Sequence, residues 1–180
     1  KIIKKSSLFF VFCISMMGAN HIRMALGAGL AAATLGEPSL ETSILLVFGS
    51  LVGGLLPDID HPKSILGSMI IIKPITWWFQ GKKGQWNEHR GATHSALAVA
   101  LLIFFAFLSD WNPFLVGVAI GHPIHMLGDY ITKGGITLLF PIRKRYKCKL
   151  GLIYYGSPYE YLIANAFLLV GAYIFIKHFF

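Results

Sequence analysis

The sequence predicts an all-α integral membrane protein: a bundle of about five transmembrane helices with one further interfacial or re-entrant segment. Hydrophobic residues make up 55% of the 180-residue chain and charged residues only 13%, and its mean hydropathy is +0.63. The apolar residues form separate blocks, each slightly shorter than the about 20 residues that cross a bilayer upright. The net charge of +8 does not indicate a nucleic-acid-binding domain, because such a domain would not carry so much continuous apolar sequence.

Glycine and proline mark the breaks between the apolar blocks, as in Leu56-Pro57-Asp58. The expected spans are residues 22–36, 41–56, 94–108, 113–131 and 161–176. Small residues in the first two spans, among them Gly27, Gly49 and Gly53, should let these helices pack closely.

A sixth apolar segment, residues 65–79, contains Lys73 and Pro74 and ends in the aromatic run TWWF. We therefore expect it to lie along the interface or to re-enter the bilayer without crossing. With the N-terminus inside, the outer loops 37–40 and 109–112 contain no Lys or Arg. Nearly all basic residues fall on the inner side, and Lys177 lies at the outer end of the last span. This asymmetry predicts five crossings with a cytoplasmic N-terminus.

The first residues, KIIKK followed by LFFVFCISMMGA, resemble the basic and apolar regions of a signal peptide, but no convincing cleavage site follows. One interpretation takes Met17 as the biological start, residues 1–16 as an upstream extension and 17–180 as a single membrane domain. The other takes the stretch as an extension of the first helix. Cys13 and Cys148 lack CxxC spacing, so we expect reduced thiols without a special role.

Histidines and aspartates gather at the helix ends that this topology places on the inner side. His125 and Asp129 share one helical face because they are four residues apart. Ionisable residues at membrane depth usually face a partner or a cavity. The expected metal ligands are His21, Asp58, Asp60, His61, His89, His94, His125 and Asp129. Their mixture of imidazole and carboxylate favours zinc or manganese, with about one to three ions, over calcium or magnesium.

Several neighbouring residues have two interpretations. Arg90 could hold a phosphate or carboxylate beside the metal, or it could be a basic anchor of the inner side. Asp60 could bind the ion or orient a neighbouring imidazole. Thr93 could hydrogen-bond a ligand or cap the next helix. His122 precedes Pro123, which bends the helix, so we expect His122 to have a structural role.

The strings LPDIDHPKS, HRGATHS and GHPIHMLGDYITKGGITLLFP occur in this order along the chain. On these strings the chain resembles the YdjM-like family of bacterial inner-membrane, metal-dependent hydrolases associated with LexA-regulated induction. The resemblance implies a metal-binding hydrolase of the inner membrane, with its site facing the cytoplasm on the topology above. The matching motif residues include the ligands named above, together with Arg90 and Glu160 in SPYE. The expected catalytic residues are then Asp60, Arg90 and Glu160. The chain departs from the family pattern after Gly121, where it has His122-Pro123 and the family commonly has an aromatic or similar residue.

No GxSxG, Walker A or CxxC motif is present, so the mechanism that fits is metal-activated water attacking a phosphoryl or carbonyl group. The HxxxD element also resembles, more weakly, zinc-dependent phospholipase C and P1-type nucleases, which supports phosphoester over amide hydrolysis. The expected partners are membrane lipid and a small phosphorylated or lipid-linked substrate, with no nucleic acid and an open oligomeric state. A metal-ion transporter or sensor, or a structural protein stapled by its metal, are the alternatives.

Overall fold

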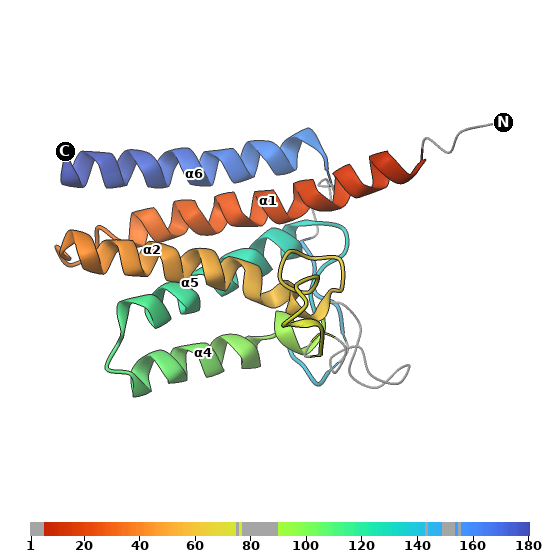
Figure 1. The fold of residues 1–180 in the computed structure, drawn as a ribbon, viewed down its shortest axis with the longest axis horizontal. Coiled ribbons are helices and arrows are strands. Elements are labelled where there is room, and N and C mark those ends of the chain that lie inside the picture. The colour runs from red at the N-terminus through yellow and green to blue at the C-terminus, as the bar shows by residue number, and fades with distance from the viewer. Residues whose placement is uncertain (1–5, 75, 77–89, 143, 149–153, 155) are drawn as a thin grey trace.

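The computed structural model describes residues 6–74, 76, 90–142, 144–148, 154 and 156–180 (Figure 1). These residues form the predicted all-α bundle without a β-strand in the described part of the chain. The helices are α1 (Ser6–Ala32), α2 (Leu40–Leu55), α4 (Ala96–Leu108), α5 (Pro113–Ile131) and α6 (Pro158–Phe179), with 3₁₀ turns η1 (Leu56–Asp60) and η2 (Ala92–His94).

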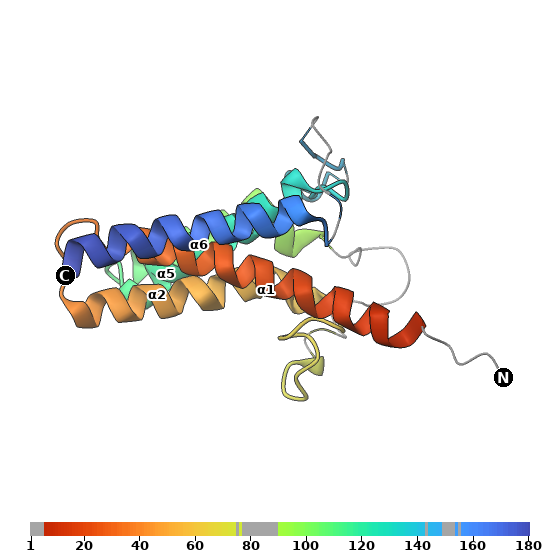
Figure 2. The same cartoon turned by 90° about the horizontal axis from the view of Figure 1, so that it is seen from above.

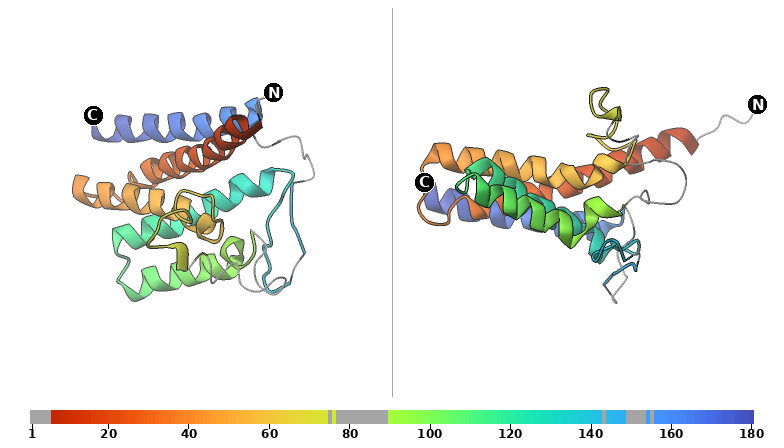
Figure 3. Two further views of the ribbon diagram at one scale, coloured as in Figure 1. Left: turned by 45° about the vertical axis from the view of Figure 1, so that its right-hand side comes forward. Right: turned by 90° about the horizontal axis from the view of Figure 1, so that it is seen from below.

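The helices lie side by side along the long axis of the molecule. Helix α1 packs between α6 and the pair α2–α5, and α4 covers α5 on the far side (Figure 1). The turns that follow α2 and α5 lie at the end of the bundle away from the C-terminus (Figures 2 and 3). We call this end, which holds η1, η2, the last turns of α5 and the first turn of α6, the polar end. The topology thus brings the ends of four separate segments together.

Three helical segments are long and apolar enough to cross a membrane by length and composition, namely Leu40–Asp60, Pro113–Ile131 and Pro158–Phe179. Helix α4 is apolar but shorter. Much of its surface is exposed, including Phe104 and Phe107, as are Leu169 and Ile176 of α6, as expected for helices that face lipid. A multi-pass membrane bundle therefore fits the structure, and the number of five crossings stays a prediction.

Local sequence explains where the helices begin. Ser39, Ser95 and Ser157 each accept a hydrogen bond from a backbone N–H of the first turn of the following helix. Asn112 does the same for α5, whose first residue is Pro113. Because Ser95 is the cap of α4, His94 lies outside that helix, whereas the sequence placed it as the first residue of a span.

Glycines allow a close contact between α2 and α5. An added Cβ at any of four glycines would run into the backbone of the opposite helix; these are Gly49 and Gly53 on α2 and Gly117 and Gly121 on α5. The expectation that small residues allow close packing is confirmed for Gly49 and Gly53, and also for Gly27, which meets the backbone of α6. This close contact sets the distance between η1 and the last turns of α5.

The segment after η1 is not a spanning helix over residues 65–72, where the backbone forms successive turns. The hydroxyl of Ser64 donates to the Asp58 carbonyl (2.6 Å), and that of Thr76 donates to the Ile59 carbonyl (2.9 Å), so the segment folds against η1. Ile70 and Ile71 remain 81% and 85% exposed. These residues agree with an interfacial or re-entrant position; the aromatic end of the predicted segment, from residue 77, lies outside the described residues.

Helix α1 includes residues 6–16, whose backbone continues directly into the rest of the helix. The division of the chain at residue 17 stays a prediction.

Candidate metal centre

Five of the predicted ligands meet at the polar end of the bundle. They are His21 on α1, Asp58 in η1, His94 in η2, and His125 and Asp129 on α5. His94, His125 and Asp129 are each no more than 1% exposed, and His21 is 7% exposed. Burying several imidazoles and a carboxylate is costly unless they are paired or coordinate a cation, so this cluster requires an explanation.

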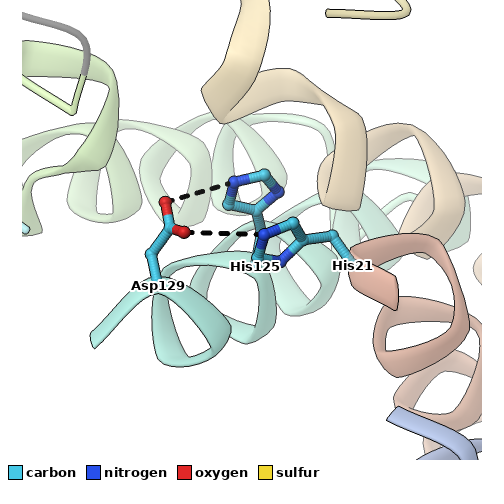
Figure 4. A group of neighbouring side chains, drawn as sticks. All are labelled: His21, His125 and Asp129. Atoms are coloured by element: carbon cyan, nitrogen blue, oxygen red, sulfur yellow. Dashed lines mark ion pairs between the residues drawn. The ribbon is translucent and has the colours of Figure 1, made fainter. Parts of the chain in front are cut away.

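The Asp129 carboxylate pairs with both His21 and His125 (Figure 4). Its Oδ1 is 2.6 Å from Nη2 of Arg90 and 3.5 Å from Nε2 of His21. Its Oδ2 is 3.1 Å from Nε2 of His94 and 3.7 Å from Nε2 of His125. One carboxylate therefore faces three imidazoles and a guanidinium at once.

The hydrogen bonds of His125 fix which ring nitrogen carries its proton. Nδ1 lies 2.7 Å from the carbonyl oxygen of Gly54, and a carbonyl only accepts, so Nδ1 is the donor. In the neutral ring Nε2 then has a lone pair. This Nε2 is buried without a hydrogen bond and lies 3.6 Å from Oδ1 of Asp58. A nitrogen lone pair that faces carboxylate oxygens in a buried place is unfavourable by itself, and a cation bound between them would stabilise it.

Three candidate donor atoms from Asp58, His94 and His125 lie close enough together to hold one ion, and Asp129 lies beside the two imidazoles. Oδ1 of Asp58 is 4.0 Å from Nε2 of His94 and 3.6 Å from Nε2 of His125, while Oδ2 of Asp129 is 3.1 and 3.7 Å from the same two nitrogens. With metal–ligand bonds of about 2.0–2.1 Å, the ligand atoms of a tetrahedral zinc ion lie about 3.4 Å apart. Asp58, His94 and His125 therefore offer one carboxylate and two imidazole donors to a divalent ion.

Two groups of candidate ligands in the described residues share one member. His21, His125 and Asp129 form one group, and Asp58, His94 and His125 form the other. His125 has a single nitrogen to offer because Gly54 occupies the other. The two groups therefore overlap at His125, whose one available nitrogen can serve only one ion. The expected number of one to three ions stays a prediction. The His21 ring stacks on that of His125 with centroids 3.8 Å apart, so His21 flanks this site.

Burial lowers the pKa of His94 below its ordinary value, and this effect outweighs the neighbouring Asp129 carboxylate, which raises it. The neutral imidazole that binds metals is therefore the favoured form of His94 near neutral pH. Because η2 carries His94, the contact between His94 and Asp129 holds η2 against α5.

We expect the purified wild-type protein to contain about one equivalent of zinc or manganese, and His125→Ala to lose it. Asp58→Ala should retain part of the metal, because the Asp58 side chain is 22% exposed and water can take its place. Elemental analysis of the purified variants measures this. His178→Ala, at the opposite end of α6, is the control and should keep the full metal content. An undiminished metal content in His125→Ala would contradict the site.

Arg90 is buried and pairs with Asp129. It is 3% exposed, its Nη2 donates to Asp129, and its Nη1 donates to the Gly135 carbonyl at 3.4 Å. Its backbone has a left-handed conformation with φ of 74°, which is uncommon for a non-glycine residue. The guanidinium is thus paired with a buried carboxylate beside the candidate ligands. A catalytic role of Arg90 stays a prediction.

Other predicted site residues lie outside both ligand groups. Oδ2 of Asp60 accepts a hydrogen bond from the Thr93 hydroxyl (2.8 Å), and Nδ1 of His61 accepts one from the backbone N–H of Lys63 (3.1 Å). His89 lies outside the described residues. His122 is 2% exposed and bonds the Thr93 carbonyl, which fits the structural role expected for it.

Glu160 has partners on two other segments. Its Oε1 accepts from the amide of Asn20 (3.0 Å) and its Oε2 from the backbone N–H of Gly156 (2.8 Å). It therefore links the start of α6 to α1 and to Gly156, which precedes the helix. Its predicted catalytic role is untested.

The fold and the cluster define a helical membrane protein with a buried histidine–aspartate site at one end. The chain belongs to the family described as YdjM inner membrane protein, which matches residues 16–179. The resemblance seen in the sequence is thereby confirmed. The YdjM-family inner-membrane location agrees with the candidate spans.

The chain is 36% identical over 129 residues to the inner membrane protein YdjM of Escherichia coli (strain K12), covering 67% of this chain and 62% of that protein. The same values hold for YdjM of Shigella flexneri. The chain is also 31% identical over 166 residues to the uncharacterized protein YvsG of Bacillus subtilis (strain 168), covering 89% of this chain and 94% of that protein. The alignment thus spans less than two thirds of the two YdjM proteins. No solved structure matches the chain.

Proposed function

We propose that this chain is a membrane-bound, metal-dependent hydrolase that acts on a phosphoester at the cytoplasmic face of the bacterial inner membrane. The observation that supports it is the buried Nε2 of His125, which has no hydrogen bond and is aimed at two carboxylates. Zinc and manganese both accept this donor set. A divalent cation there supplies Lewis acidity and acidifies water at neutral pH.

The side chains of the site differ in burial, and this difference indicates which of them hold the metal and which face the substrate. His94, His125 and Asp129 are inaccessible and hold fixed donor positions, whereas Asp58 is partly exposed. Substrate and water therefore approach from the Asp58 side. Arg90 balances the negative charge of Asp129 and keeps its carboxylate in one orientation. A phosphoester fits this arrangement because its anionic oxygens suit a cation-lined site.

Basic residues support the cytoplasmic orientation. The loops at the end opposite the site, residues 37–40 and 109–112, contain no Lys or Arg, whereas Lys63, Lys133 and Arg145 belong to the turns at the polar end. Under the positive-inside rule the polar end faces the cytoplasm. The exposed Ile70 and Ile71, on the segment folded against η1, favour a substrate with an apolar part, such as a lipid-linked phosphate.

The test is hydrolysis by purified protein whose metal content has been measured. We expect zinc- or manganese-dependent release of phosphate or alcohol from a panel of phosphomonoesters and phosphodiesters that includes phospholipids. His94→Ala should abolish this activity, since it removes a buried donor. His178→Ala, at the other end of the bundle, should retain it. A metal-loaded protein that is inactive on the whole panel would overturn the hydrolase proposal.

A structural metal is the second candidate, because the ligand residues belong to four segments, α1, η1, η2 and α5. A metal that only staples these segments would make chelation unfold the protein, with no variant that separates stability from activity. The transporter alternative has weaker support, because a transport path needs ligands at several depths and the described ligands lie at one end. Metal uptake by vesicles that contain the protein would favour transport.

A further inference from the structure

Thr93 contacts two candidate site residues, Asp60 and His94, and also the buried His122. Its hydroxyl lies 2.8 Å from Oδ2 of Asp60 and 3.0 Å from Nδ1 of His94. Its carbonyl oxygen lies 2.9 Å from Nε2 of His122. Thr93 is in η2 and therefore joins η1, through Asp60, to α5, through His122. A residue placed only to cap a helix would not need these three contacts.

Counting protons gives the direction of each bond. A threonine hydroxyl has one proton, and a carboxylate only accepts, so the Thr93 hydroxyl donates to Asp60. That proton is not available for His94, and the contact between them therefore requires Nδ1–H of His94 to donate to the Thr93 oxygen. The neutral His94 ring then has its lone pair on Nε2, the nitrogen that faces Asp129 at 3.1 Å.

We propose that Thr93 is a positioning residue of the metal site. Because its hydroxyl proton is donated to Asp60, its oxygen accepts the Nδ1–H of His94, and this leaves the Nε2 lone pair of His94 directed toward the ion. The inference rests on the proposed metal binding and does not depend on the reaction catalysed. Asp60 then acts through Thr93 and is not itself a ligand. His125 follows the same rule, with the Gly54 carbonyl in the place of the Thr93 hydroxyl.

The third contact of Thr93, with His122, fixes its backbone. The carbonyl accepts from Nε2 of His122, a residue that is 2% exposed and lies one turn before His125 on α5. Thr93 is therefore held from both sides, through its hydroxyl by Asp60 of η1 and through its carbonyl by His122 of α5. In this arrangement the buried His122 holds the backbone of Thr93, a role that its position in the sequence did not reveal.

The test is metal affinity, measured by competition with a chromophoric chelator. Thr93→Val keeps the shape and removes the hydroxyl, and we expect it to weaken metal binding by about 10- to 100-fold, the usual effect of losing a residue that orients a ligand. Thr93→Ser keeps the hydroxyl and should bind within about 3-fold of wild type. Thr34→Val, whose hydroxyl bonds the Ala31 carbonyl at the other end of the bundle, is the matched control and should bind as wild type.

The double variant distinguishes a relay from a direct ligand. If Asp60 acts through Thr93, then Asp60→Ala combined with Thr93→Val should bind no more weakly than Thr93→Val alone. Additive losses would assign Asp60 its own bond to the metal and overturn the inference. Equal affinity of Thr93→Val and wild type, or equally weak binding by Thr93→Ser and Thr93→Val, would also overturn it.

A measurement on the wild-type protein covers the case in which Thr93→Val does not fold. In the metal-free protein above neutral pH, nitrogen-15 NMR of labelled histidines should show the Nδ1–H tautomer for His94, and the Nε2–H tautomer would overturn the inference. Failure of the metal-centre proposal has a different result, because wild-type protein would then bind no zinc or manganese at all.

Discussion

Asp129→Leu is expected to abolish metal binding and to lower the free energy of unfolding by about 3–5 kcal/mol, the usual cost of removing one partner of a buried ion pair. Asp129 is 1% exposed, and its carboxylate contacts Arg90, His21, His94 and His125. The substitution takes away a ligand and also leaves the buried Arg90 guanidinium without its carboxylate. Elemental analysis and unfolding followed by circular dichroism in detergent measure the two effects.

Two companion variants separate the tasks of this carboxylate. Asp129→Asn keeps an oxygen for Arg90 but loses the charge, so it should lose the metal with a smaller loss of stability. Arg90→Met combined with Asp129→Leu removes both buried charges and should regain much of the stability of metal-free wild type, but not the metal. Wild-type metal content in Asp129→Leu would exclude Asp129 as a ligand. A double variant as unstable as Asp129→Leu would show that the ion pair is not the cause of the instability.

The sequence was sufficient for the helices and for the grouping of most of the cluster. Helix starts depend on local residues, and the caps Ser39, Asn112 and Ser157 stand directly before helices that the apolar pattern had located. The spacing of His125 and Asp129 placed both on one face. Successive spans run in opposite directions, so the end of α2 and the start of α4 lie at the same end of the bundle. Asp58, which follows α2, and His94, which precedes α4, were therefore placed together.

The residues that orient the ligands were harder to predict from the sequence. The Gly54 carbonyl bonds His125 only because glycines bring α2 and α5 together, and a backbone carbonyl carries no side-chain signal in the sequence. Glu160 lies at the polar end as expected, yet its oxygens bond Asn20 and Gly156, which a pattern of acidic residues cannot reveal. Arg90 was predicted at the site, but its pairing with Asp129 depends on the folded path of the chain.

Gly121→Ala is expected to reduce stability and metal affinity together. A Cβ at this position would run into the Ser50 carbonyl and come within 2.9 Å of the Gly54 nitrogen, so α2 and α5 must move apart. Overpacking of this kind costs about 1–3 kcal/mol. The same displacement moves the Gly54 carbonyl away from Nδ1 of His125, since His125 lies one turn after Gly121 on α5. We therefore expect weaker metal binding although no ligand is changed.

Gly18→Ala provides the matched control for this coupling between packing and metal binding. A Cβ at Gly18 would meet its nearest neighbour, Cδ1 of Ile65, at the ordinary distance of 3.5 Å, so the added methyl group should cost nothing and should favour the helix by up to about 1 kcal/mol. Unfolding in detergent and chelator competition measure stability and affinity for both variants. Gly121→Ala with wild-type affinity would show that the His125–Gly54 bond does not depend on the α2–α5 contact. The metal site would then be held by η1, η2 and α5 alone.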